Sequence, residues 1–263
     1  MNMVNTVIDS DKNFSSPLGV RGQNYNSYTV ADQEVWKLLF ERQMQKLPAI
    51  ASIDYLEGID KAGFTAEHIP NFETEINPRL KPLTGWTVVA CEGLVPIKEF
   101  FELLADKKFP ASTWLRTKEQ IEYLEEPDMF HDTFGHIPLL TNQAFCDFLA
   151  EFSVISLKYI HVEEAVKLLQ KLYWFTVEFG LIRENNKLKI YGGGIISSSG
   201  ESVYSLVSGV PERVPYCIEE ILKTEVKIDA YQKKYFVIES YEQLFQSLKN
   251  FEEILERQLL VYQ

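Results

Sequence analysis

The segment NQAFCDFLAEFSVISLKYI (142–160) indicates the fold class, because its apolar residues recur every three or four positions. That spacing is typical of an amphipathic helix with one broad apolar face. Residues 162–181 repeat the pattern, so two consecutive long helices are expected to form the core of a mostly helical protein. The expected face of the first helix comprises Phe145, Phe148, Leu149, Phe152, Ile155 and Tyr159.

Shorter elements are expected on both sides of this helical pair. The β-branched run WTVVAC (86–91) and the run KLKIY (187–191) favour short strands. Residues 68–85 contain three prolines and are expected to be mostly loop. Further helices are expected at 31–47, where Asp32 would cap the first turn, and at 49–59, 96–108 and 240–263.

The chain shows no internal repeat and no low-complexity linker after residue 30. Residues 1–30, rich in Asn and Ser, are expected to form a flexible N-terminal arm. Residues 31–263 are expected to form one domain, mostly α with a few short β strands. The C-terminal helix is amphipathic, so it would either dock on its own domain or pair with a second subunit.

Composition excludes several classes of protein. A net charge of −12 over 263 residues argues against binding nucleic acid, which requires a basic surface. No apolar run reaches the length of a membrane span, and the N-terminus lacks the pattern of a secretory signal. The three cysteines are scattered and form neither a disulfide framework nor a metal knuckle. We therefore expect a cytoplasmic protein without membrane segments.

Two of the four histidines lie close together in EPDMFHDTFGHIPLL (126–140). A spacing of five does not place two side chains on one α-helical face. Gly135 and Pro138, however, are typical of a helix end. A short helix would then carry His131, and His136 would project just after it, so that both imidazoles could converge on one ion.

Two imidazoles need a third ligand, and Glu178 is the best candidate. It is the single carboxylate in the aromatic and aliphatic stretch LYWFTVEFGL (172–181), where an unpaired buried charge would be costly. Two histidines and one carboxylate with open positions form the facial triad of non-haem Fe(II) oxygenases. The same three ligands also suit zinc, so the ligand types alone leave iron and zinc equally open.

Three motifs in this order resemble the aromatic amino acid hydroxylases, in particular the single-domain bacterial members that act on phenylalanine. They are EPDMFHDTFGHIPLL, YWFTVEFGLI (173–182) and YGGGIISSSGE (191–201). The segments VWKLLFERQ (35–43) and ACEGLVPIKEFF (90–101) add to the resemblance, which covers about residues 28–245.

The resemblance implies a monooxygenase that converts L-phenylalanine to L-tyrosine by 4-hydroxylation. It implies non-haem Fe(2+), tetrahydrobiopterin or a related tetrahydropterin, and O2, held by a catalytic domain of the family's fold. Tryptophan or tyrosine hydroxylation stays open as an alternative, as does a zinc hydrolase on the same His-His-Glu site. The chain has no long terminal coiled coil like that of the animal tetramers, so a monomer or homodimer is expected.

The resemblance also assigns roles to individual residues. His131, His136 and Glu178 match the iron ligands, and Tyr173 matches a tyrosine near the iron with a catalytic role. Other residues match those that bind or orient the amino acid substrate or steady an iron-ligating histidine. They are Arg116, Pro127, Asp128, Trp174, Ser197 and Glu201.

The pterin site is implied by a second group of residues. Phe100 would stack on the pterin ring, while the backbone of the preceding loop would hydrogen-bond it. Asp132 stands where animal members carry Glu, and Pro96-Ile97 replaces a pair of serines, so the exact pterin contacts are expected to differ. The residues matching the pterin site are Gly93, Leu94, Val95, Phe100 and Asp132.

Overall fold

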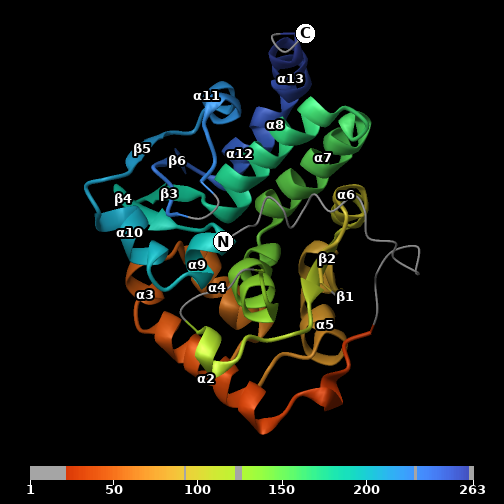
Figure 1. Ribbon diagram of the computed structural model, residues 1–263, viewed down its shortest axis with the longest axis vertical. Coiled ribbons are helices and arrows are strands. Elements are labelled where there is room, and N and C mark those ends of the chain that lie inside the picture. Colours follow the sequence, from red (N-terminus) through yellow and green to blue (C-terminus); the bar gives the residue numbers. More distant parts are fainter. Residues whose placement is uncertain (1–21, 92, 122–125, 228–229, 261–263) are drawn as a thin grey trace.

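The computed structural model describes residues 22–91, 93–121, 126–227 and 230–260, and most of them are helical. The expectation of a mostly α protein with a few short strands is confirmed. In Figure 1 helices α7 and α8 lie in the upper half of the molecule, below α13. The α-helices in chain order are α2 Val30–Met44, α3 Leu47–Ile50, α4 Ile53–Ala62, α5 Asn77–Thr84, α6 Ile97–Ala105, α7 Gln143–Tyr159, α8 Glu163–Tyr173, α9 Gly193–Ser197, α10 Glu201–Val207, α11 Ile218–Lys223, α12 Tyr241–Ser247 and α13 Phe251–Leu259.

Short π and 3-10 turns extend or join these helices. The π-helical turns are η2 Phe72–Ile76, η4 His131–His136 and η6 Trp174–Glu178. The 3-10 turns are η1 Tyr25–Ser27, η3 Lys118–Gln120, η5 Ile137–Thr141 and η7 Leu248–Asn250.

The strands form two small sheets on different sides of the molecule in Figure 1. β1 and β2 pair in parallel, with α6 as the crossover between them. The second sheet has the order β4-β3-β6-β5, in which β3 and β4 form an antiparallel hairpin. Only β1 and β4 were predicted, because the sequences of the other strands show no clear alternation of apolar and polar residues. The strands are β1 Thr87–Cys91, β2 Lys108–Ser112, β3 Leu181–Glu184, β4 Lys187–Ile190, β5 Glu212–Pro215 and β6 Lys234–Ile238.

Helix α7 confirms the apolar face predicted from its sequence. The Asn142 side chain caps its start by accepting a hydrogen bond from the Phe145 amide at 2.9 Å. The predicted residues from Phe145 to Ile155 are buried, and Tyr159 is half-buried at the end of the helix. Helices α6, α8 and α12 all pack against α7, which makes it the centre of the hydrophobic core.

The first two predicted helices need corrections at their starts. Thr29, not Asp32, is the N-cap of α2, and Asp32 completes a capping box by accepting from the Thr29 amide at 2.7 Å. The single helix expected at 49–59 is divided into α3 and α4. Ser52 separates them, since its side chain caps α4 by accepting from the Tyr55 amide.

The expectation that residues 68–85 are mostly loop is wrong. Asn71 caps η2, and α5 follows directly. Pro78 lies in the first turn of α5, where a missing amide hydrogen costs nothing. Pro82 lies inside this helix of eight residues, which is held by buried Leu80 and by the hydrogen bond from the Thr84 hydroxyl to the Leu140 carbonyl. Tertiary contacts therefore override the local signal of the prolines.

Part of the expected N-terminal arm is docked on the domain. The Tyr25 hydroxyl donates to the Ile69 carbonyl at 2.8 Å, and the Tyr28 hydroxyl donates to the Thr113 carbonyl at 2.8 Å. These two tyrosines of the expected arm thus contact the domain. Residues 1–21 lie outside the described part.

The C-terminal segment docks on its own domain. The helix predicted at 240–263 is interrupted by η7 and continues as α13, which Figure 1 places at one end of the molecule. Leu244, Leu248, Phe251 and Leu255 are buried, as their spacing predicted. The Tyr159 hydroxyl of α7 donates to the Glu256 carboxylate of α13 at 2.9 Å. Residues 261–263 lie outside the described part, and no described helix has both the length and the apolar character to cross a membrane.

Candidate metal centre and active-site pocket

Two π-helical turns bring the three predicted metal ligands together. A π-turn closes hydrogen bonds between residues five apart, so it places His131 and His136 on the same face of η4. Sequence reasoning had assumed a helix that ends at Gly135. In the structure Gly135 lies inside the π-turn, and Pro138 occupies the first turn of η5. The predicted convergence is therefore correct, and its predicted cause is wrong.

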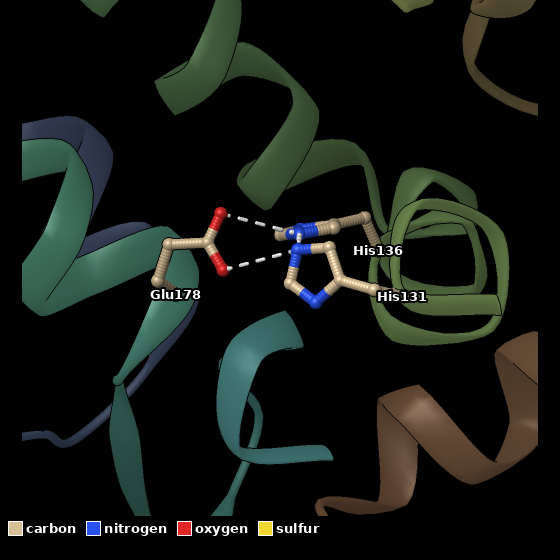
Figure 2. Close-up of side chains that lie close together, drawn as sticks. All are labelled: His131, His136 and Glu178. Carbon is tan, nitrogen blue, oxygen red and sulfur yellow. Dashed lines mark hydrogen bonds and ion pairs between the residues drawn. The ribbon is translucent and has the colours of Figure 1, made fainter. Parts of the chain in front are cut away.

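The side chains of His131, His136 and Glu178 face one another in the interior, as Figure 2 shows. The two Nε2 atoms of the histidines are 3.3 Å apart. The Nε2 atom of His136 lies 3.3 Å from Glu178 Oε1, and that of His131 lies 3.7 Å from Glu178 Oε2. All three residues are buried.

The electrostatics of the cluster favour a positive charge between the three groups. Burial lowers the pKa of His131, which keeps this imidazole neutral and its lone pair available. Burial also opposes a charge on His136, but the Glu178 carboxylate outweighs it and raises the pKa of His136. Burial likewise opposes the charge on Glu178, yet the two imidazoles hold its pKa below the ordinary value.

The donor set fits a divalent metal ion. Glu178 Oε2 is buried and has no hydrogen-bond partner among the described residues, which is costly for a carboxylate oxygen. Two imidazole nitrogens converge on the same point. A metal bound by these three atoms would satisfy all of them and keep positions open toward the pocket.

Glycines allow the segments around the ligands to pack closely. A Cβ atom on Gly192 would lie 2.3 Å from the Glu178 carbonyl oxygen, and one on Gly135 would lie 2.8 Å from the Gly193 carbonyl oxygen. The backbone beside Gly192 belongs to Glu178, and Gly135 directly precedes His136, so a side chain at either position would disturb a candidate ligand. The glycine run was noted in the sequence as a motif, and the structure supplies this reason for it.

Two hydroxyl groups support the π-turn of the histidines, one from α4 and one from within the turn. The Tyr55 hydroxyl of α4 donates to the Phe134 carbonyl at 2.6 Å, and the Thr133 hydroxyl donates to the Met129 carbonyl at 2.6 Å. These bonds satisfy polar groups within the segment that carries both imidazoles. Tyr55 was not identified from the sequence, since its partner is 79 residues away.

Arg116 and Asp128 form a buried ion pair. Asp128 accepts from Arg116 Nε at 2.7 Å and from Arg116 Nη2 at 2.8 Å. It also accepts from the backbone amides of Arg116 at 3.0 Å and His131 at 3.1 Å. One fully buried carboxylate therefore ties the guanidinium to the segment that carries the first histidine.

Ser197 supports a metal ligand directly. Its Oγ atom lies 2.8 Å from Nδ1 of His131. A proton on Nδ1 donated to Ser197 leaves Nε2 of the histidine free to bind a metal. This geometry agrees with one of the two roles that the resemblance allowed for Ser197.

Glu201 is placed elsewhere. It is buried at the start of α10 and does not line the pocket beside the metal centre. Its Oε1 atom accepts from the Tyr235 hydroxyl at 2.6 Å and from the Gln232 amide at 3.1 Å. The contacts in the structure thus connect Glu201 to the second sheet rather than to a histidine.

Glu201 predicts a measurable dependence of stability on pH. Burial raises the pKa of Glu201 from its ordinary value of 4.5 to about 7. Between these values the folded protein keeps a proton that the unfolded chain releases, so the free energy of unfolding falls as the pH rises. The loss amounts to at most about 3 kcal/mol. We expect Glu201→Gln, which keeps the acceptor for Tyr235, to match the wild type near pH 4.5 and to exceed it in stability at pH 8.

Urea unfolding at several pH values from 4.5 to 8 measures this difference directly. Subtracting the wild-type profile from that of the variant removes the contribution of all other groups. Parallel profiles would show that Glu201 does not titrate in this window.

A pocket adjoins the metal centre and is lined by many of the predicted residues. The three ligands, Pro127 and Trp174 lie in its wall. The predicted pterin residues Gly93, Leu94, Val95, Phe100 and Asp132 also line it, as does Tyr173. Arg116, Asp128, Ser197 and Glu201 are not part of this lining.

The wall near the predicted pterin residues is largely aromatic. The ring of Phe100 meets that of Tyr173 edge-on, with centroids 5.4 Å apart. Asp132 is turned toward β2, where it accepts from the Ser112 amide at 2.8 Å and from the Ser112 hydroxyl. Burial raises the pKa of Asp132 above its ordinary value.

Several lining residues were missed by sequence reasoning. Strand β2 supplies Phe109 and Ser112. The ring centroids of Phe109 and His136 are 5.2 Å apart, and the Ser112 amide donates a hydrogen bond to Asp132. β2 was not predicted, so its side chains could not be assigned to the pocket. Trp114 and Gln170 also line the pocket, and no sequence pattern distinguished them.

Comparisons with known proteins agree with this site. Residues 22–263 match the family described as biopterin-dependent aromatic amino acid hydroxylase. Phenylalanine-4-hydroxylase of Ralstonia nicotianae is 46% identical over 227 residues, which cover 86% of this chain and 72% of the relative. The enzyme of that name from Chromobacterium violaceum is 43% identical over 85% of this chain and 74% of its own length.

Solved structures of the Chromobacterium violaceum enzyme have the same fold. The structure with iron and phenylalanine bound has a TM-score of 0.87 and 39% identity, and covers 92% of this chain and 88% of that one. The structure with iron(III) and 7,8-dihydrobiopterin also has a TM-score of 0.87. It is 41% identical and covers 91% of this chain and 86% of that one. With its three ligands, its pocket and these matches, the chain belongs to the biopterin-dependent aromatic amino acid hydroxylases.

Proposed function

We propose that this chain hydroxylates L-phenylalanine to L-tyrosine with Fe(II), a tetrahydropterin and O2. The observation that carries the proposal is the buried His131, His136 and Glu178 cluster beside a pocket lined by aromatic residues. Relatives more than 40% identical are named phenylalanine-4-hydroxylase, and a similar structure contains iron and phenylalanine. The alternatives of tryptophan or tyrosine hydroxylation and of a zinc hydrolase have no comparable support.

The three ligands would hold the iron. With iron bound, the tetrahydropterin would supply the two electrons needed to activate O2, and O2 would provide the oxygen atom that enters the substrate. The chain's own residues provide position and exclude water. His131 is fixed by Ser197, and Asp128 ties the start of its helical turn to Arg116. Tyr173, whose half-buried side chain lies in the pocket wall near Glu178, keeps its proton because desolvation raises the pKa of its hydroxyl.

Phenylalanine would bind between the metal centre and Arg116. Asp128 occupies Nε and Nη2 of the guanidinium, and a guanidinium has five N–H donors, so donors remain for the substrate carboxylate. Trp174 and Pro127 would enclose the benzyl group with flat apolar surface. Ser197 acts on this site through His131, and the position of Glu201 supports only an indirect role.

The pterin would bind at the wall formed by the Gly93–Val95 loop and Phe100. Gly93 has a φ of 74°, a left-handed conformation that exposes backbone groups of this loop. Phe100 offers a ring for stacking, and Asp132 offers a half-buried carboxyl group in the same lining. We further propose that residues 31–263 act as one catalytic domain, as a monomer or homodimer, in the cytoplasm.

The test compares substrates and metals on the same protein. Metal-free protein reconstituted with Fe(II) and given a tetrahydropterin and O2 should form tyrosine from phenylalanine. Turnover of tyrosine and tryptophan under the same conditions should be much slower. A clear preference for tryptophan would replace phenylalanine as the substrate, and activity with Zn(II) but not Fe(II) would refute the monooxygenase.

A further inference from the structure

The short helix α9 packs against two of the candidate metal ligands through its first two residues, both glycines. A Cβ atom on Gly193 would lie 2.4 Å from Cε1 of His136. A Cβ atom on Gly194 would lie 3.0 Å from Oε2 of Glu178. Because these contacts leave no free space, a shift of the helix toward the ligands would displace the imidazole or the carboxylate.

The third candidate ligand, His131, is held by the other end of α9. Ser197 is the last residue of this helix, and its Oγ atom lies 2.8 Å from Nδ1 of the histidine. All three candidate ligands therefore contact one helix of five residues. A helix this short has few hydrogen bonds of its own, so contacts from the rest of the domain must fix its position.

Two side chains from the end of α2 and the turn after it hold this segment. Nε2 of Gln43 donates to the carbonyl of Ile196, the residue before Ser197. Nζ of Lys46 donates to the carbonyl of Ser199 at 2.7 Å and to its hydroxyl oxygen at 3.1 Å. The last carbonyls of a helix lack partners within it, so the bond from Gln43 satisfies a buried group that the helix leaves open.

The Gln43 side chain contributes little net stability to the fold. Gln43 is 2% exposed, and its Oε1 atom has no hydrogen-bond partner among the described residues. A buried acceptor without a partner destabilises a folded protein, which offsets the gain from the bond to Ile196. What the bond does provide is a fixed backbone position directly before Ser197.

We propose that Gln43 is a positioning residue for the metal centre and that it acts through α9. By fixing the Ile196 carbonyl, its amide holds Ser197 beside His131 and keeps the two glycines against the other ligands. Gln43 lies on α2 and does not line the pocket, so it would act without contacting substrate, pterin or metal. The inference rests on the proposed metal centre and adds α2 to the elements that support it.

Cobalt binding tests this proposal without turnover. The metal-free full chain is titrated with Co(II), whose visible absorption bands depend on the geometry of its ligands. For Gln43→Leu we expect the Kd for Co(II) to rise about tenfold and the bands to shift, because loss of supporting contacts weakens metal binding by about this factor. Gln45→Leu, the matched control, removes an exposed amide two residues further along the chain and should match the wild type.

Stability and kinetics separate a positioning role from a purely structural one. The melting temperature of metal-free Gln43→Leu should stay within about 3 °C of the wild type, because loss of the bond to Ile196 and removal of the unpaired Oε1 atom nearly cancel. With Fe(II), a tetrahydropterin and O2, kcat for tyrosine formation should fall about tenfold, while KM for phenylalanine should stay within about twofold. Gln43→Met also lacks the donor and replaces the leucine variant if that protein does not fold.

A double variant tests the path through α9. Ser197→Ala should also weaken Co(II) binding, and the double variant should lose less affinity than the product of the two single losses, because both changes act through one helix. Losses that multiply fully, or an unchanged Kd and spectrum in Gln43→Leu, would overturn the proposal.

The same titrations separate this proposal from the proposed reaction. If the wild type binds Co(II) but forms no tyrosine from phenylalanine with Fe(II), the reaction is refuted, and metal binding still decides the role of Gln43. If the wild type binds no Co(II), the metal centre and the role of Gln43 are refuted together.

Discussion

Replacing Glu178 by Gln is expected to remove both the bound iron and tyrosine formation. The amide keeps the shape of the side chain but lacks the negative charge that offsets the cation and holds the pKa of His136 above its ordinary value. We expect iron affinity to fall by at least about 100-fold and tyrosine formation by about 1,000-fold or more. Iron per chain from elemental analysis and tyrosine from chromatography measure the two effects separately.

A matched control is Glu184→Gln. Glu184 is a half-buried glutamate that accepts hydrogen bonds from the Ile53 amide, away from the metal centre. This variant should retain both iron and activity. Full iron occupancy in Glu178→Gln would mean that the carboxylate is not a ligand.

The second large effect is expected from Asp128→Ala. Asp128 is fully buried and holds two guanidinium nitrogens and two backbone amides. Its removal leaves the buried charge of Arg116 without a partner, which typically costs about 3–5 kcal/mol of stability. We expect the melting temperature to fall by roughly 10 °C and the KM for phenylalanine to rise, because the guanidinium loses the group that orients it.

Asp128→Asn provides a milder variant if the alanine protein does not fold. It keeps one acceptor for the guanidinium, so its melting temperature should lie between those of the wild type and the alanine variant. Glu34→Ala breaks the exposed ion pair with Lys118 and should leave the melting temperature nearly unchanged. Equal losses in Asp128→Ala and Glu34→Ala would contradict the structural role of the buried pair.

The helical core was predictable because its signal is local. In α7 the spacing of apolar residues and the capping Asn142 lie within one short stretch, and both act as expected. Residues 68–85 show the opposite case. Their prolines are a strong local signal for a loop, and packing of Leu80 against the core outweighs it.

Part of the candidate site could likewise be predicted from the sequence, and part could not. The types of the ligands could be read from the sequence, since two histidines and an isolated glutamate are chemically distinctive. Their geometry could not, because the π-turn of η4 is supported by Tyr55 from a helix 79 residues earlier. The motif grouped Glu201 with the site, but its hydrogen-bond donors are Tyr235 of β6 and Gln232, which precedes that strand.

The helical class, the apolar face of α7 and the residues able to bind a metal could all be predicted from the sequence. Periodicity and side-chain chemistry are properties of short segments. The tertiary structure alone decided where those groups meet. It formed the π-turns that align the ligands and placed four N–H donors around Asp128. It also buried the Gln170 Nε2 atom in the pocket wall. These features depend on contacts between segments far apart in the chain, and such contacts leave no periodic signal in either segment.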